Sequence, residues 1–323
     1  MTIQLRPLGT TGIRIAPLVL GTNVFGWTAD EPTSFAILDA FVDAGFDAID
    51  TADSYSHWVP GNTGGESETT IGRWLARDPS KRARVHLFTK VGSTMPGNGM
   101  KKTLAKRWIV QAAEDSLRRL GVETIDLYQS HWPDPATPHE ETLEAYAELL
   151  RAGKVRAIGC SNYDATQLAD ALRVADERGL PRYQTLQPPY NLYDRAGYEG
   201  PLRDLAIREG LGVITYYGLA SGFLTGKYRS RDDLAKHARG GGVAKYMDDR
   251  GMRILAALDQ VAARHQVEQA QVALAWLMQR DGVTAPIASA TSVEQVRSLV
   301  RATELALSAD DVARLDEASA PAT

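Results

Sequence analysis

Two stretches, VHLFTKV at residues 85–91 and KRWIVQAAEDSLRRLGVETIDLYQS at 106–130, decide the fold class. The first is a short apolar run typical of a buried strand, and the second begins with a helical pattern that ends in another apolar run at 125–130. The apolar face of this helix consists of Ile109, Ala113, Leu117 and Leu120. Two strands joined through a helix are expected to lie parallel in one sheet.

The same alternation of strand and helix extends in both directions along the chain. We predict eight strands, near residues 18–21, 48–51, 85–91, 125–130, 155–159, 185–187, 212–216 and 284–288. Helices are expected to follow them, among others at 34–44, 106–120, 138–152 and 165–178. Eight such units in 323 residues suit an α/β fold of the (β/α)8 TIM barrel type, with residues 1–323 forming a single domain.

Three segments fall outside this repeat. Residues 5–20 have two apolar runs around a Gly-Thr-Thr-Gly turn, which predicts an N-terminal β-hairpin that covers one barrel end. Residues 222–250 are rich in glycine and charge and are typical of a lid loop. Residues 310–318 predict an extra C-terminal helix.

Composition excludes several classes of protein. A formal net charge of −4 leaves no strong basic field, which argues against nucleic acid as a partner. Cys160 is the only cysteine and the six histidines lack metal-binding spacing, so neither a disulfide nor a metal site is expected. No secretory signal and no run of ~20 apolar residues is recognisable, so we expect a cytoplasmic protein without a membrane span.

Four polar residues stand at or just after the ends of consecutive predicted strands: Asp50, Tyr55, Lys90 and His131. The active site of such a barrel lies at the carboxyl ends of its strands, so these side chains should share one mouth. Taken singly, each is also typical of a helix cap, a surface position or simple packing. Their joint occurrence favours catalysis.

The four residue types suit the reduction of a carbonyl group. A tyrosine can protonate the developing alkoxide if a neighbouring cation lowers its pKa, and Lys90 is the candidate cation for Tyr55. Asp50 would hold that lysine charged and oriented. His131 would donate a hydrogen bond to the carbonyl oxygen.

The motifs around these residues, Asp50-Thr-Ala-Asp-Ser-Tyr55, Thr89-Lys90 and Ser130-His131-Trp132, resemble the tetrad of the aldo-keto reductase superfamily. The resemblance covers nearly the whole chain, from Leu8–Gly12 to Ser289–Gln295. It implies an NADPH/NADP+-dependent oxidoreductase that acts on a small-molecule carbonyl substrate.

By that resemblance, Ser161 and Asn162 bind the nicotinamide carboxamide with support from Gln187, and Tyr216 stacks beneath the ring. A loop with Lys227 covers the pyrophosphate, and residues 289–295 bind the adenosine end near a helix N-terminus. The implied cofactor set is Thr22, Asp50, Ser161, Asn162, Gln187, Tyr216, Leu219, Ser221, Leu224, Gly226, Lys227, Arg239, Ser289, Thr291 and Gln295.

The chain departs from the family pattern near the cofactor. Tyr217-Gly218 stands where many relatives carry Ser-Pro, and Leu299 stands where an asparagine usually meets the adenine. The basic residues that some relatives place at 289–291 are absent, so the preference for NADPH follows from the family rather than from residues of this chain.

Three tryptophans, Trp27, Trp58 and Trp132, follow the first, second and fourth predicted strands. With Tyr55 and His131 they predict an apolar substrate pocket suited to aromatic carbonyl compounds. The alternative for each tryptophan is that it packs loops together.

Two other functions stay open. The chain also resembles potassium-channel β subunits, so an NADP(H)-binding module for interaction or redox sensing, with little turnover, is an alternative to a reductase. A metal-dependent hydrolase built on Asp50 and His131 would need further ligands that the sequence does not offer. The physiological substrate, the direction of the reaction and the choice between a monomer and a homo-oligomer are not determined by the sequence.

Overall fold

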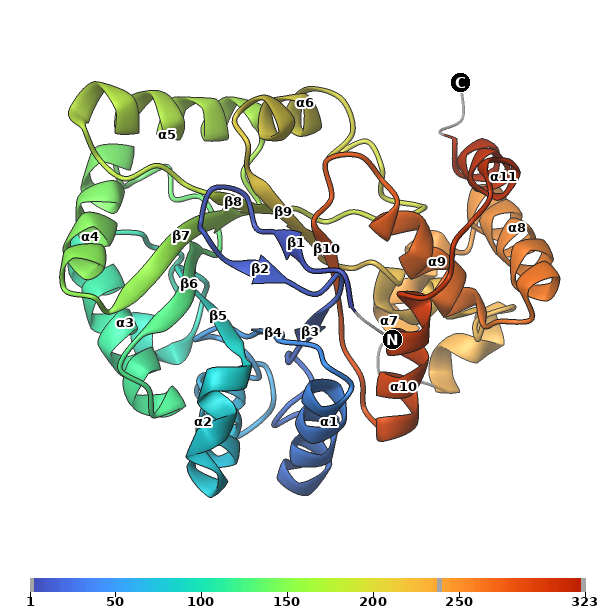
Figure 1. Ribbon diagram of the computed structural model, residues 1–323, viewed down its shortest axis with the longest axis horizontal. Coiled ribbons are helices and arrows are strands. Elements are labelled where there is room, and N and C mark those ends of the chain that lie inside the picture. The colour runs from blue at the N-terminus through green and yellow to red at the C-terminus, as the bar shows by residue number, and fades with distance from the viewer. Residues whose placement is uncertain (1–2, 237–239, 321–323) are drawn as a thin grey trace.

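The computed structural model describes residues 3–236 and 240–320. Eight parallel strands close into a barrel in the order β10-β3-β4-β5-β6-β7-β8-β9 (Figure 1). Their bounds are β3 Val19–Gly21, β4 Ala48–Asp50, β5 His86–Val91, β6 Ile125–Ser130, β7 Val155–Ser161, β8 Thr185–Gln187, β9 Gly212–Thr215 and β10 Ala285–Ala288. The predicted (β/α)8 barrel is confirmed.

Helices surround the barrel. They are α1 Glu31–Asp43, α2 Glu66–Arg77, α3 Lys106–Leu120, α4 His139–Arg151, α5 Ala165–Arg178, α6 Pro201–Arg208, α9 Gln269–Met278 and α10 Val293–Ala302. Short 3-10 helices, η1 Pro79–Arg84 and η2 Pro96–Asn98, flank β5. Helix α1 begins three residues before the expected Ser34, because the Asp30 carboxylate accepts a hydrogen bond from Thr33 N and caps the helix there.

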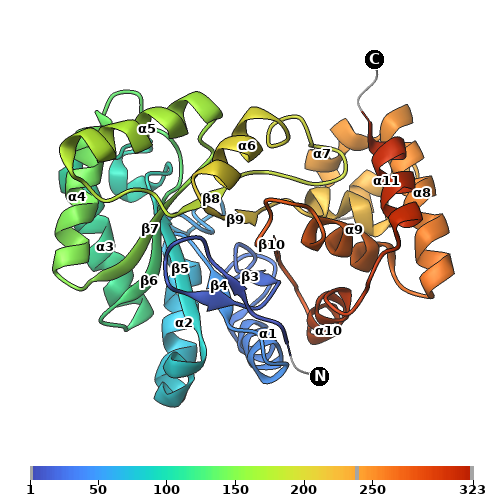
Figure 2. The same cartoon turned by 45° about the horizontal axis from the view of Figure 1, so that its top comes forward.

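Two further helices form an outer layer. Helix α8, Asp249–His265, precedes α9, and α11, Ala309–Ser319, ends the described chain. They lie beside each other beyond α9, on the side away from the centre of the barrel (Figure 2). Extra C-terminal helices were predicted, but only α11 was located in the sequence, and the bounds of α8 were not. No helix of the described part of the chain is long and apolar enough to cross a membrane.

The N-terminal hairpin closes the amino end of the barrel. Its strands are β1 Arg6–Pro7 and β2 Arg14–Ile15, and Leu8, Ile13 and Ile15 join the apolar cluster inside the barrel. Gly9 approaches so closely that a Cβ there would stand 2.3 Å from the Gly212 nitrogen. The predicted hairpin is therefore confirmed, and only the carboxyl ends of the strands stay open.

The stretch predicted as a lid loop is more ordered than expected. It contains η3 Ala220–Thr225, η4 Arg231–Lys236, α7 Gly240–Val243 and η5 Ala244–Tyr246. Phe223, Leu224, Tyr228 and Tyr246 are fully buried. These apolar residues anchor the segment to the core. The prediction of a lid loop considered the content of glycine and charge and missed these anchors.

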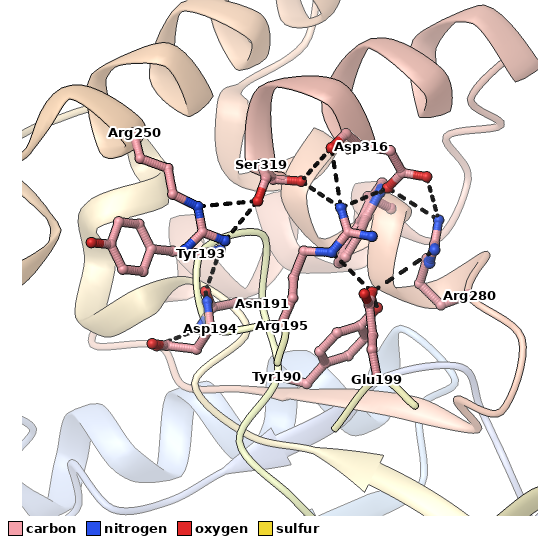
Figure 3. A network of polar contacts seen from close by, with 11 residues as sticks. Tyr190, Asn191, Tyr193, Asp194, Arg195, Glu199, Arg250, Arg280, Asp316 and Ser319 are labelled. Carbon is pink, nitrogen blue, oxygen red and sulfur yellow. Dashed lines mark hydrogen bonds and ion pairs between the residues drawn. The ribbon is translucent and has the colours of Figure 1, made fainter. Parts of the chain in front are cut away.

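A polar network joins the outer helices to the barrel (Figure 3). The guanidinium of Arg195, in the segment between β8 and α6, donates to Glu199 at 2.9 Å, to Asp316 at 3.2 Å and to Ser319 Oγ at 2.7 Å. Arg280 at the end of α9 also donates to Asp316, at 2.9 Å. The side chain of Arg195 is only 12% exposed, so its loss would leave partly buried carboxylate oxygens with fewer partners.

We expect Arg195→Met to lower the free energy of unfolding by about 2 kcal/mol, because charge-assisted hydrogen bonds across two layers are lost. Urea unfolding measures this change. Arg314→Met is the matched control: Arg314 lies on α11 and makes an exposed bond to Gln260, so its change should stay within about 0.5 kcal/mol. Equal effects of the two substitutions would contradict a specific role for the network.

Candidate active site

A cavity of about 780 Å³ opens at the carboxyl ends of the strands. It contains most of the residues predicted for the site. Those that line it are Asp50, Tyr55, Trp58, His131, Trp132, Ser161, Asn162, Gln187, Tyr216, Leu219, Ser221, Lys227, Ser289, Thr291 and Gln295.

Lys90 lies at the centre of the tetrad. Because Phe88 points into the barrel, the strand alternation also directs Lys90 inward, where it is 0% exposed. Its Nζ donates to Asp50 Oδ2 at 2.6 Å, to Tyr55 Oη at 2.9 Å and to Thr51 O at 2.7 Å. All three donor positions of the ammonium group are thus used.

Asp50 is fixed from two directions. Gln187, from β8, donates to Asp50 Oδ1 at 3.0 Å, so the carboxylate bridges β5 and β8. Thr22 Oγ1 donates to the main-chain oxygen of Asp50 at 2.9 Å and accepts from Ser67 at 2.8 Å. Thr22 is fully buried behind Asp50 and does not line the cavity, although the resemblance implied that it binds the cofactor.

Burial acts against charge throughout this group. It raises the pKa of Tyr55 well above the ordinary value, and the Asp50 carboxylate and Tyr217 raise it further. Burial also lowers the pKa of Lys90 and raises that of Asp50, while their mutual attraction opposes both shifts. The sequence led us to expect a lowered pKa for Tyr55 beside Lys90; burial and the nearby carboxylate instead raise it.

A neutral Tyr55 still suits an acid, because a phenol must hold its proton in order to donate it. A cation 2.9 Å from the hydroxyl oxygen is placed where it could stabilise a phenolate.

His131 follows β6 and is held by a hydrogen bond from its main-chain nitrogen to Val91 O at 2.7 Å. Its ring centroid lies 6.0 Å from that of Tyr55. Burial lowers the pKa of His131 well below its ordinary value, and the cations Lys90 and Lys102 lower it further. Its Nδ1 is buried and finds no hydrogen-bond partner among the described residues. The imidazole is therefore neutral, with one N–H to donate.

Asn162 joins the tetrad to the residues predicted to bind nicotinamide. It adopts a left-handed conformation with φ +63°. Its Nδ2 donates to His131 O at 2.8 Å, and its Oδ1 accepts from Tyr216 Oη at 2.6 Å. Ser161 Oγ donates to Gln187 O at 2.8 Å, which holds the neighbouring strands in register.

The other half of the cavity lies along β10 and α10. Ser289 Oγ donates to Asn23 Oδ1 at 2.7 Å, and Gln295 Oε1 accepts from Thr291 N at 2.8 Å. Leu224 is fully buried, and Gly226 packs tightly against Gln269. Arg239 lies outside the described residues.

Aromatic rings form the rim. Trp58 is 43% exposed and its ring lies 6.3 Å from that of Tyr55. Trp132 stacks on His131 at 6.3 Å. Trp27 contacts Trp58 edge-on at 5.8 Å, which places it as a support for that ring.

Several lining residues were not predicted: Asn23, Thr28, Ser54, His57, Ser93, Glu268 and Ser298. Asn23 and Ser93 follow β3 and β5 within two residues, so a wider search of strand ends would have found them. Glu268 and Ser298 belong to helices that approach the cavity from outside the barrel, and no local pattern marks them. The described residues contain no group of three side chains suited to hold a metal ion.

Comparisons with known proteins identify the family of the chain. The model of the aldo/keto reductase family matches residues 17–320. Protein tas of Escherichia coli (strain K12) is 32% identical, covering 97% of each chain. Aldo-keto reductase YhdN of Bacillus subtilis (strain 168) is 33% identical over 94% of this chain and 90% of that protein. L-glyceraldehyde 3-phosphate reductase of E. coli (strain K12) is 30% identical over 98% and 92%.

We expect the His131 ring to remain neutral at pH 6, because burial lowers its pKa. Nuclear magnetic resonance of ¹³C-labelled histidine, assigned with His131→Gln, measures the titration. The unfolded chain takes up this proton near pH ~6.5, so the free energy of unfolding should fall as the pH drops below that value. A titration of His131 centred near pH ~6.5 in the folded protein would contradict the expectation.

Proposed function

Because the chain belongs to the aldo/keto reductase family, we propose that it reduces aldehydes and ketones to alcohols with NADPH as the hydride donor. The observation that carries the proposal is the position of the buried Lys90 Nζ, which contacts both Asp50 and Tyr55 from beneath the lining of the cavity. A buried cation beside a phenol is an arrangement that stabilises a phenolate after proton donation.

The cavity fits a nicotinamide dinucleotide. Its volume of about 780 Å³ lies in the range of small-molecule and cofactor sites. Asn162 and Tyr216 offer an amide and an aromatic face, and the N-terminus of α10 offers main-chain N–H groups for an anion. Lys227 lines the same cavity and adds a positive charge. When bound, the nicotinamide supplies the hydride from C4 to the carbonyl carbon.

Each residue of the tetrad then has its own role in binding and protonating the carbonyl oxygen. His131 donates a hydrogen bond to the carbonyl oxygen, which orients and polarises it. Tyr55 transfers its proton to that oxygen as negative charge develops. Lys90 stabilises the resulting phenolate, and Asp50 keeps Lys90 charged and in place. Each of these steps requires that water be excluded from the site, and the burial of these side chains excludes it.

The rim supports a preference for aromatic or otherwise apolar carbonyl compounds. Trp58 and Trp132 flank the position between Tyr55 and His131 where the carbonyl would lie. Aromatic side chains offer large apolar area and favour ring-to-ring contact. We also propose that residues 1–323 act as a single domain and need no metal.

We expect purified protein to oxidise NADPH in the presence of a nitrobenzaldehyde, measured as the fall in nicotinamide absorbance. Tyr55→Phe should lower kcat by about 100-fold or more while NADPH binding is retained, because only the proton is removed. Tyr193→Phe is the matched control, since Tyr193 loses the same hydroxyl group but does not line the cavity.

Full turnover by Tyr55→Phe would contradict the role of this residue. Tight NADPH binding without turnover on a broad panel of carbonyl compounds would instead favour the sensing module.

We expect Trp58→Ala to raise KM for aromatic aldehydes about five- to tenfold, because a ring contact worth roughly 1–1.5 kcal/mol is lost. The value of kcat should change little. A short aliphatic aldehyde, which cannot reach the ring, serves as the control substrate with the same variant. Unchanged kinetics for the aromatic substrates would remove Trp58 from the substrate pocket.

A further inference from the structure

The cavity extends beyond the tetrad into a space between the N-terminus of α9 and the first turns of α10. Glu268, Ser298 and Leu299 line it there, together with Thr291 and Gln295. A dinucleotide whose nicotinamide lies at Asn162 and Tyr216 would place its adenosine half in this space. The charges that line this end would then lie near the ribose of the adenosine.

Glu268 is the acidic residue at this end. It is the N-cap of α9, and its Oε2 accepts a hydrogen bond from Ser298 Oγ at 2.5 Å. Its side chain is 63% exposed, so the carboxylate remains in contact with the cavity and with solvent. Glu268 forms an ion pair with Arg301, in which 3.9 Å separates Glu268 Oε1 from Arg301 Nη2. Both side chains are more than half exposed. Such a pair is screened by water and does not cancel the charge.

Positive charge is scarce along the cavity. Lys227 is the one lysine or arginine among the described residues that line it. Positions 289–291 are Ser, Ala and Thr, and two of these have local partners: Ser289 bonds Asn23, and Thr291 bonds Gln295. The lining of the adenosine end therefore combines one carboxylate with neutral side chains, and Arg301 stands beside that carboxylate without lining the cavity.

We infer that Glu268 is a specificity-determining residue that weakens the preference for NADPH, so that NADH serves as a second hydride donor. The two nucleotides differ only at the 2′ position of the adenosine ribose, which carries a phosphate dianion in NADPH and a hydroxyl group in NADH. A carboxylate repels the dianion, whereas it accepts a hydrogen bond from the hydroxyl. The inference rests on the proposed function and refines its cofactor.

The expected size of the effect follows from the charges. A single carboxylate ~7 Å from a dianion in a water-like medium weakens binding by about five- to tenfold. Glu268→Gln removes the charge but keeps an oxygen that can accept from Ser298 and cap α9. This substitution therefore separates the charge from the structural role of the side chain.

The experiment measures the Kd of NADPH and of NADH by quenching of tryptophan fluorescence in the wild-type protein, Glu268→Gln and Asp310→Asn. Asp310, exposed in the first turn of α11, is the matched control for a change of one unit in net charge. Glu268→Gln should bind NADPH about five- to tenfold more tightly and NADH no more tightly than the wild type. The gain should shrink at high salt, and Asp310→Asn should change neither constant.

An unchanged ratio of the two constants in Glu268→Gln would overturn the inference, as would a wild-type preference for NADPH above about 100-fold. If either of these two results is found and carbonyl reduction still depends on Tyr55, the proposed function survives and only the role of Glu268 fails. If neither nucleotide binds to the wild type or to the variants, the proposed function itself fails.

Discussion

The buried ion pair between Lys90 and Asp50 is the constraint on which the site depends. Two charges that are at most 1% exposed lose most of their hydration, a cost that only good geometry offsets. The structure provides it: Thr51 O and Tyr55 Oη accept from the ammonium, and Gln187 donates to the carboxylate. The pair is thus stable only when β4, β5 and β8 are all in place, which requires a closed barrel.

Closure also decides where chemistry can occur. The hairpin fills the amino end with Leu8 and Ile15, while the open carboxyl end gathers side chains from strands far apart in the sequence. The same burial keeps Tyr55 protonated and His131 neutral. In the proposed mechanism, these two neutral groups and the fixed cation Lys90 stabilise negative charge on a carbonyl oxygen. The barrel therefore sets the protonation of the site residues as well as their positions.

Hydrogen bonds connect the outer helix α11 to the rim of the cavity through the segment between β8 and α6. Asn191 Nδ2 donates to Tyr217 O at 3.0 Å, and Asp194 accepts from Tyr246 Oη at 2.7 Å. Arg195 then connects this segment to α11. The segment between β8 and α6 therefore contacts the rim of the cavity, the segment predicted as a lid and helix α11. Residues outside the barrel thus help to hold the rim in place.

The local elements could be predicted from the order of the residues alone: α3 and α5 have the predicted bounds, and Asp50, Lys90 and His131 were identified at strand ends. Periodicity and residue type are local properties, so they carry this information without a structure. Four features follow from the packing of distant segments instead: Thr22 supports Asp50, α8 pairs with α11, burial raises the pKa of Tyr55, and Glu268 lines the cavity. Burial and electrostatic fields are sums over residues distant in the chain, and no local pattern contains them.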